Sequence, residues 1–226
     1  PDDYEFGQGT VEDCNSNGLP DDCDVAPGLA FEAPSTVSVA GGSDPVVVRG
    51  GDFNGDGLMD VLAAYRTSGR VALHRGKGDG TFRLPNTYAV DADALYLEAP
   101  DIDGDGDLDA VVVSQSAQTV KILENRGVNG TTWQGFTVRS DSYYIGFAPF
   151  GLGVGDFTGD GAPDIVVSGG DSYIQLLVQQ ADGTILARPN LTTAIAPNGL
   201  AAADLDGDGD LDVAVACLSG GPATLS

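Results

Sequence analysis

Four short segments of this 226-residue chain share one pattern of acidic residues and glycines. Each has nine residues, with an oxygen-bearing side chain at positions 1, 3, 5 and 9 and glycine at position 6. They begin at Asp52, Asp101, Asp156 and Asp204, so successive starts are 49, 55 and 48 residues apart. Alternate side chains of a tightly curled loop point inward, and glycine adopts the backbone angle that other residues resist. Oxygen ligands gathered in this way, with the position-7 carbonyl as a further donor, predict a Ca²⁺ site in each loop.

A solvated acidic turn that binds no metal is the alternative interpretation of any one loop. Two carboxylates about 5 Å apart repel by ~3 kcal/mol at an effective dielectric constant of about 20, and each loop holds at least three. Because four loops keep the same register and each leads into an apolar run, we favour ion sites over solvated turns.

The charge of the chain is strongly negative and concentrated. The formal net charge is −24, and 20 of the 34 acidic residues lie in the four loops and in residues 13–24. This distribution favours ion sites over a disordered acidic tail. The ten lysines and arginines form no basic cluster, so we expect neither nucleic acid nor an anionic membrane as a partner. No apolar run approaches the length of a membrane span, so we expect no membrane insertion.

Residues 1–28 differ from the rest and contain a fifth candidate loop. Its spacing matches a twelve-residue calcium loop with glycine at position 6. The ligands would be Asp13, Asn15, Asn17, the carbonyl of Leu19, Asp21 and Asp24. Cys14 and Cys23 flank the loop and could form a disulfide that ties its ends together. A metal-free, disulfide-closed turn is the alternative, and we favour calcium together with the disulfide. Both features indicate an extracellular location, since disulfides persist in oxidising compartments.

The rest of the chain repeats, with a period typical of propeller blades or arrays. Short β-prone runs precede each loop, at residues 45–49, 95–99, 151–155 and 200–203. Others follow it, at residues 61–65, 110–114, 165–168 and 213–217. Third strands are predicted at residues 70–75, 119–124 and 173–179, and fourth strands after glycine turns, one of them from Phe82. We therefore predict an all-β fold of four-stranded antiparallel meanders, with the Asp-rich loop between strands 1 and 2.

The two ends of the array are complementary. The segment from Phe31 to Thr36 aligns with the one from Phe82 to Thr87, which indicates a strand 4 with no earlier blade. The last repeat has sequence for at most a third strand, within residues 222–226. The first strand could complete the last blade and close a ring. It could instead complete the last blade of a neighbouring molecule, which would give a filament.

These repeats resemble FG-GAP/VCBS repeats, the calcium-loop blades of integrin α-subunit propellers and of many secreted bacterial proteins. Phe150-Gly151 and Asp156-Phe157-Thr158-Gly159-Asp160-Gly161 carry the likeness most fully, and Gly78-Asp79-Gly80-Thr81-Phe82 resembles the VCBS turn. The N-terminal loop is similar to thrombospondin type 3 and dockerin-like loops. The resemblance implies a β-propeller-like array of four blades with Ca²⁺ in the hairpin loops, whereas family propellers usually have seven blades.

The resemblance also implies a ligand set for each loop, in which the position-7 residue contributes its carbonyl. The first two sets are Asp52, Asn54, Asp56, Leu58 and Asp60, and Asp101, Asp103, Asp105, Asp107 and Asp109. The other two are Asp156, Thr158, Asp160, Ala162 and Asp164, and Asp204, Asp206, Asp208, Asp210 and Asp212. Because Thr158 offers only a neutral hydroxyl, the third site should be the weakest.

We find no sequence signature of an enzyme. The single histidine, His74, lies on a predicted third strand among apolar residues, and no nucleophile, Walker or dinucleotide motif occurs. Cys217 is expected to be a small buried residue. The aromatic residues before the third loop, including Trp133, could form a contact surface for a sugar or a protein, but we expect them mainly to pack.

Taken together, the sequence predicts a secreted or cell-surface, non-catalytic, calcium-binding protein of adhesion or extracellular structure. Its ligand would be a protein or a glycan. Two alternatives are a filament or matrix subunit that binds copies of itself head to tail, and an accessory domain of a larger polysaccharide-active enzyme. The expected domains are residues 1–28 and an array over residues 29–226, with repeats at 29–76, 77–126, 127–179 and 180–226.

Overall fold

The computed structural model describes residues 44–170, 172–194, 196–218 and 224–225. The chain divides into two compact units, Pro1–Ser38 and Val39–Ser226, and all described residues belong to the second. The predicted N-terminal calcium loop, the Cys14–Cys23 disulfide, the strand near Phe31 and the boundary after residue 28 lie outside the described residues.

Every regular element in the described residues is a β-strand, which confirms the predicted all-β class. The first strands of the sheets are β1 (Pro45–Gly51), β5 (Ala94–Glu98), β12 (Pro149–Gly155) and β17 (Pro197–Ala203). The second strands are β2 (Asp60–Tyr65), β6 (Ala110–Ser114), β13 (Asp164–Gly169) and β18 (Asp212–Cys217). The third strands are β3 (Arg70–His74), β7 (Thr119–Asn125), β14 (Tyr173–Gln179) and β19 (Thr224–Leu225).

Fourth strands complete three of these sheets: β4 (Asn86–Ala89), β10 (Phe136–Val138) and β15 (Ile185–Ala187). Each sheet is an antiparallel meander in chain order, β1-β2-β3-β4, β5-β6-β7-β10 and β12-β13-β14-β15, followed by the three-stranded β17-β18-β19. Two short strands, β11 (Tyr143–Tyr144) and β16 (Leu191–Thr192), pair with β7 and β14. A hairpin of β8 (Val128–Asn129) and β9 (Thr132–Trp133) is inserted between β7 and β10.

The fourth strand of the first sheet begins later than predicted. Phe82 forms only an isolated bridge with Gly76, and β4 starts at Asn86. Pro85 lies between them and has no N–H to donate to a ladder, so regular pairing resumes only after it.

The middle strands carry continuous apolar runs because both of their faces are covered. All five residues of β6 are buried. Val111 and Val113 belong to one apolar cluster with residues of β12 and β13 of the third sheet. Ala110 and Val112 belong to another cluster, with residues of β2 and β3 of the first sheet. Since successive side chains of a strand point to opposite faces, the core lies between consecutive sheets, which stack face to face.

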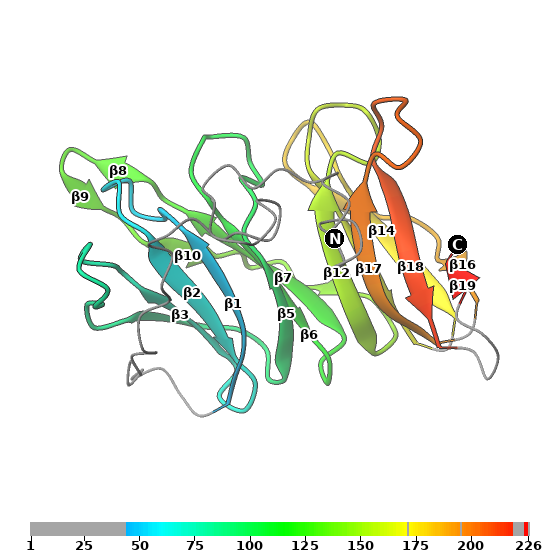
Figure 1. The fold of residues 1–226 in the computed structure, drawn as a ribbon, viewed down its shortest axis with the longest axis horizontal. Helices are drawn as coiled ribbons and strands as arrows, with labels where there is room; N and C mark the ends of the chain where they lie inside the picture. Colours follow the sequence, from blue (N-terminus) through cyan, green and yellow to red (C-terminus); the bar gives the residue numbers. More distant parts are fainter. Residues whose placement is uncertain (1–43, 171, 195, 219–223, 226) are drawn as a thin grey trace, which may run out of the picture. The chain divides into compact units, whose positions relative to one another are not determined.

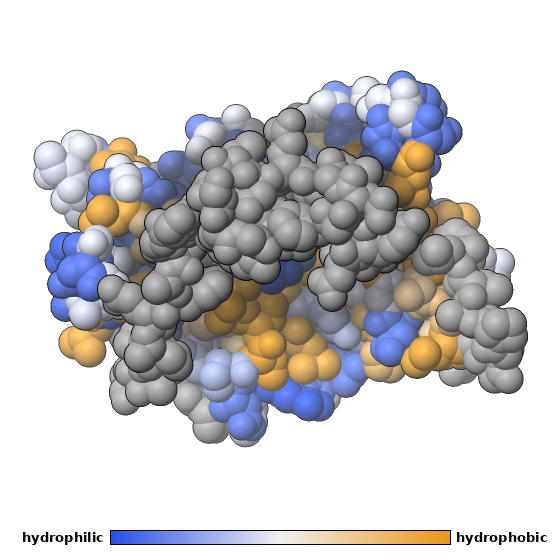
Figure 2. Space-filling model, in the orientation of Figure 1, coloured by the Kyte–Doolittle hydropathy of each residue, from blue (hydrophilic) through white to orange (hydrophobic). Residues whose placement is uncertain are grey.

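The first strands lie next to one another in the stack, with β1 beside β5, β5 beside β12 and β12 beside β17. In Figure 1 the loops that join first to second strands lie along the upper edges of the sheets. Figure 2 shows hydrophilic surface at the loop between β17 and β18, and apolar surface where β1 and β5 lie. Among the described residues, no helix has the length and apolar character needed to cross a membrane.

Candidate metal centre

Each Asp-rich loop joins the first strand of a sheet to its second strand, as the sequence predicted. The loops follow β1, β5, β12 and β17 and end at the start of β2, β6, β13 and β18. All four are therefore built on paired strands, which fix the two ends of each loop.

The position-1 aspartate organises the backbone of its loop. In the second loop, the Asp101 carboxylate accepts hydrogen bonds from the N–H groups of Gly104 and Gly106, at 2.8 and 2.9 Å. Both glycines have positive φ, 75° and 94°, a conformation that other residues adopt at a cost. The same two bonds recur from Gly55 and Gly57 to Asp52, from Gly159 and Gly161 to Asp156, and from Gly207 and Gly209 to Asp204.

The position-5 aspartate closes a smaller turn. Its Oδ1 accepts the N–H of position 7, at 2.9 Å between Asp105 and Asp107. The other three loops repeat this bond, from Leu58 to Asp56, Ala162 to Asp160 and Asp210 to Asp208. The same two turns thus curl the backbone of each of the four loops.

The position-9 aspartate is an anchor to the third strand, a role that the sequence did not reveal. Asp109 is fully buried, and its Oδ1 accepts the Asn125 N–H at 2.7 Å while its Oδ2 accepts the Ile102 N–H at 2.8 Å. Asp60 and Asp164 are equally buried and accept the corresponding pairs, from Gly76 and Phe53 and from Gln179 and Phe157. In the fourth loop, Asp212 accepts the Leu205 N–H at 3.0 Å.

Position 3 divides the four loops into two kinds. In the first loop, the Asn54 side-chain amide donates to the Asp60 carboxylate at 2.8 Å. In the third loop, burial raises the Asp164 pKa, and a hydrogen bond from the Thr158 side chain partly opposes that rise. A neutral position 3 therefore satisfies the position-9 carboxylate within the loop.

The second loop has a charged residue at position 3 and no such donor. The Asp109 pKa is raised to about 7, chiefly by burial and also by the negative charges of Asp103 and Asp105, although the main-chain hydrogen bonds from Asn125 and Ile102 oppose the rise. Burial also raises the pKa of Asp103, as do the negative charges of Asp105, Glu124 and Asp101. Carboxylates held together in this way gain from a proton or a cation between them.

Two groups of acidic oxygens are close enough to share one ion. One oxygen from each of Asp101, Asp103 and Asp109 lies within 4.8 Å of the others, and the same holds for Asp204, Asp206 and Asp208. These hard carboxylate donors fit Ca²⁺, which takes six to eight oxygens. In the part of the chain that the structure describes, the first and third loops form no acidic group of this kind, because Asn54 and Thr158 occupy position 3.

Comparison with known proteins identifies the repeats. A model of the FG-GAP-like repeat matches residues 52–112, 101–167 and 156–215. The chain belongs to the FG-GAP-like repeat family. Each matched stretch begins at position 1 of one Asp-rich loop and runs through the next loop, so the loops mark the repeat.

A solved structure gives the fold that these FG-GAP-like repeats build. The chain is similar to BBS1N, a β-propeller-type protein solved in complex with ARL6DN and soaked with lead, with a TM-score of 0.53 and 13% identity. The match covers 79% of this chain and 52% of that one, so the chain spans about half the length of BBS1N. At this identity the likeness shows the fold alone. A comparison with curated proteins gave no significant match.

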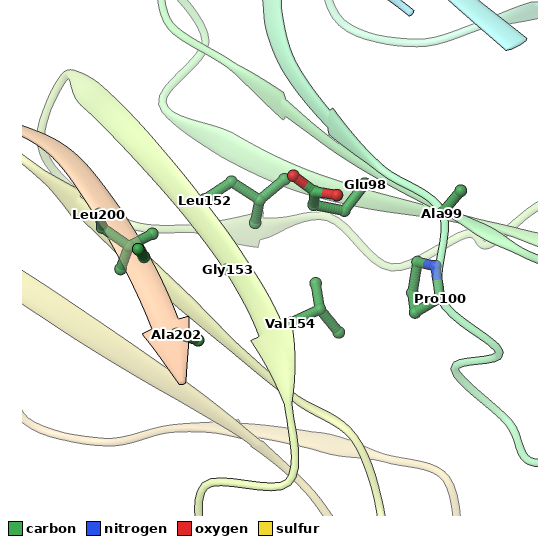
Figure 3. A pocket seen from close by; sticks show the side chains of 9 residues that line it. Glu98, Ala99, Pro100, Leu152, Gly153, Val154, Leu200 and Ala202 are labelled. Atoms are coloured by element: carbon green, nitrogen blue, oxygen red, sulfur yellow. The ribbon is translucent and has the colours of Figure 1, made fainter. Parts of the chain in front are cut away.

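A separate cavity of about 360 Å³ lies between β5, β12 and β17 of this propeller-type array (Figure 3). Glu98 and Leu152 extend toward each other across it. The Glu98 carboxylate is already engaged, because Arg49 on β1 donates to both of its oxygens, at 2.9 and 2.5 Å. Glu98 therefore serves to link β1 with β5 and is a weak candidate for binding chemistry.

Proposed function

We propose that this protein is a calcium-binding, propeller-type module of an extracellular protein, acting by binding in adhesion or extracellular structure. The observation that carries the proposal is the convergence of three carboxylates in the second loop and three in the fourth, on loop backbones that share one hydrogen-bond pattern. A bound Ca²⁺ would supply the positive charge that these clusters lack.

The loops should differ in affinity. Asp101, Asp103 and Asp109 would hold one ion, and Asp204, Asp206 and Asp208 a second. The first and third loops have fewer charges and an internally satisfied position-9 carboxylate, so they should bind more weakly. The sequence predicted the third site to be the weakest. Because Asn54 is also neutral, we expect the first site to have a similarly low affinity.

Extracellular calcium concentrations suit such sites. Extracellular modules bind Ca²⁺ with dissociation constants of about 10⁻⁴–10⁻³ M, which a calcium-poor cytosol would leave empty. Together with the excess of acidic residues, this supports secretion or display at the cell surface.

The environment of the single histidine, His74, favours a binding role over a catalytic one. His74 is 3% exposed, hydrogen-bonded to the Tyr65 hydroxyl at 3.2 Å and in edge contact with Phe82. Its burial lowers its pKa. It is therefore placed to pack rather than to exchange protons with a substrate. Head-to-tail assembly through the strand near Phe31, which lies outside the described residues, stays a prediction.

The test is thermal unfolding in EDTA and in 10 mM CaCl₂, with MgCl₂ for comparison. A ligand at ten to a hundred times its dissociation constant stabilises the folded state by about 1.4–2.7 kcal/mol per site, so we expect each occupied site to raise the melting temperature by about 3–11 °C. Asp206→Asn should reduce the rise, whereas Asp141→Asn, an exposed acid outside the loops, should not. An identical melting temperature in EDTA and calcium would overturn the proposal.

A further inference from the structure

A polar cavity of about 410 Å³ lies between the first Asp-rich loop and the β8–β9 hairpin. Asn54 and Asp56 line it from the loop, Arg75 and Arg83 from the connection between β3 and β4, and Thr131 and Trp133 from the hairpin. The hairpin reaches the loop closely, since a Cβ at Gly55 would lie 3.3 Å from the Val128 side chain. The cavity is thus built from two consecutive repeats.

Two guanidinium groups in this cavity have no acidic partner. Within the described residues, no carboxylate lies within ion-pair distance of Arg75 or Arg83. Arg70, Lys77, Arg126 and Arg188 also lack an ion pair there, but Arg75 and Arg83 line the same cavity. The Arg75 Nε is buried and makes no hydrogen bond. In a chain with a net charge of −24, two unpaired arginines that line one cavity indicate a site for an anionic group.

The Arg75 guanidinium is held in place by Trp133. Its Cζ lies 5.7 Å from the centroid of the indole ring, a cation–π arrangement. The indole Nε1–H in turn donates to Asn125 Oδ1 at 2.7 Å, and the ring meets Phe136 edge-on at 5.7 Å. The stacking surface is therefore fixed before any ligand arrives, which lowers the entropic cost of binding.

We propose that this cavity binds the carboxylate of a sugar acid, a uronic acid within a short glycan. A planar carboxylate matches the fork of a guanidinium, and Arg75 and Arg83 can both reach a group in the same cavity. A single acidic side chain is much smaller than this cavity, whose volume lies in the range of small-molecule sites. The Thr131 hydroxyl can hydrogen-bond a sugar hydroxyl, and the Asn54 amide, which gives one N–H to Asp60, keeps its other hydrogen-bonding groups.

The charge of the surroundings limits the ligand to few negative groups. Asp56 lines the same cavity, although its Oδ1 accepts the Leu58 N–H at 2.9 Å. A long polyanion would be repelled by the remaining acidic surface, whereas one or two carboxylates would not. Asn54 and Asp56 are also candidate calcium ligands of the first loop, but the proposed contacts to the carboxylate come from Arg75 and Arg83, so this site does not require a bound calcium ion.

The experiment is calorimetric or NMR titration of the full chain with galacturonic acid and digalacturonic acid, in EDTA and again in calcium. Galactose has the same ring without the carboxylate, and a Gly-Glu-Gly peptide presents a carboxylate without the sugar. We expect the sugar acids to bind at least tenfold more tightly than either control compound, in both buffers.

Arg83→Gln is the decisive variant because Arg83 is exposed and its replacement should leave the fold intact. It should weaken sugar-acid binding at least tenfold, as should Arg75→Gln, while Arg188→Gln, an exposed arginine away from the cavity, should not. Unchanged binding by Arg83→Gln, equal binding of galactose, or tighter binding of the peptide would overturn the proposal. So would loss of binding in EDTA by a folded protein, since a cation would then hold the carboxylate.

Discussion

The side-chain amide of Asn125 donates a hydrogen bond of 2.7 Å to the main-chain carbonyl of Phe53, 72 residues earlier in the chain. Asn125 ends β7 in the second sheet, and Phe53 occupies position 2 of the first Asp-rich loop. The main-chain N–H of the same asparagine holds Asp109 of the second loop. One residue thus connects two consecutive loops.

Gln179 repeats this arrangement one sheet later. Its side-chain amide donates to the Ile102 carbonyl at 2.8 Å, and its main-chain N–H donates to Asp164 at 2.9 Å. In the first sheet, Gly76 makes the main-chain bond to Asp60 and has no side chain to extend further. The first three loops are therefore linked in series, and order gained in one loop should favour order in the next.

Replacing Asn125 tests this linkage. Asn125→Ala removes donors to Phe53 and Leu108 and an acceptor for Trp133, all at a buried position. Buried polar groups left without partners cost about 1–3 kcal/mol each, partly relieved by water, so we expect the free energy of unfolding to fall by about 2–4 kcal/mol. Urea unfolding at a fixed calcium concentration measures it.

Asn129→Ala is the matched control, because Asn129 lies four residues further on and is exposed. Its effect should stay within about 0.5 kcal/mol. If Asn125→Ala were as mild as this control, the linkage between loops would contribute nothing to stability.

The loops could be predicted from the sequence because their chemistry is local. Asp and Gly at fixed spacing determine which N–H groups reach the position-1 and position-5 carboxylates, and these bonds span five residues or fewer. The position-9 aspartate was predicted only as a ligand. Asp109 also accepts the main-chain N–H of Asn125, which lies 16 positions later. The residues at the corresponding positions of the other repeats differ in type, so the sequence does not mark this contact.

The links between repeats could not be predicted for a related reason. Asn125, Gln179 and Gly76 stand at corresponding places but differ in type, and the groups that Asn125 and Gln179 reach in the preceding loop are main-chain carbonyls. Trp133 was expected mainly to pack; it meets Phe136 edge-on and also lines the cavity beside Arg75. Its stacking with Arg75 depends on the inserted β8–β9 hairpin, which no repeat pattern predicts.

The environment of His74 predicts a pH dependence of stability. Burial lowers its pKa in the folded state below the ordinary value of about 6.5. Below about pH 6.5 the unfolded chain binds a proton at this histidine that the folded protein does not bind. The contribution of neutral His74 to stability is therefore fully present above about pH 6.5 and is lost as the pH decreases. In urea titrations, we expect the free energy of unfolding of the wild type, relative to that of His74→Gln, to fall as the pH is lowered from 7.5 to 5. Parallel curves for the two proteins would contradict this.

Two glycines in extended backbone give opposite expectations. A Cβ at Gly76 would overlap the main-chain carbonyl oxygen of Met59, whereas one at Gly199 in β17 would meet nothing within 4 Å. Gly76→Ala should therefore lower the free energy of unfolding by about 2 kcal/mol or more. Gly199→Ala should raise it by up to about 1 kcal/mol, since alanine restricts the unfolded chain. Thermal unfolding of the pair in EDTA checks both signs, and a Gly76→Ala protein as stable as wild type would contradict the close approach.

The difference at position 3 predicts that one substitution will change calcium-free stability and calcium dependence in opposite directions. Asp103→Asn gives the second loop the residue of the first, where the Asn54 amide donates to Asp60. The new amide would donate to Asp109 and would remove one of the charges that disfavour its ionisation. We expect the EDTA form to gain about 1–2 kcal/mol, because a like-charge pair is lost. The stabilisation by calcium should shrink, since the ion loses a charged ligand.

Asn54→Asp should do the reverse in the first loop, and Asp141→Asn should do neither. Urea unfolding of the three variants in EDTA and in calcium separates the two effects. If Asp103→Asn lowered stability in EDTA, the carboxylates of the second loop would not be repelling one another in the ion-free protein.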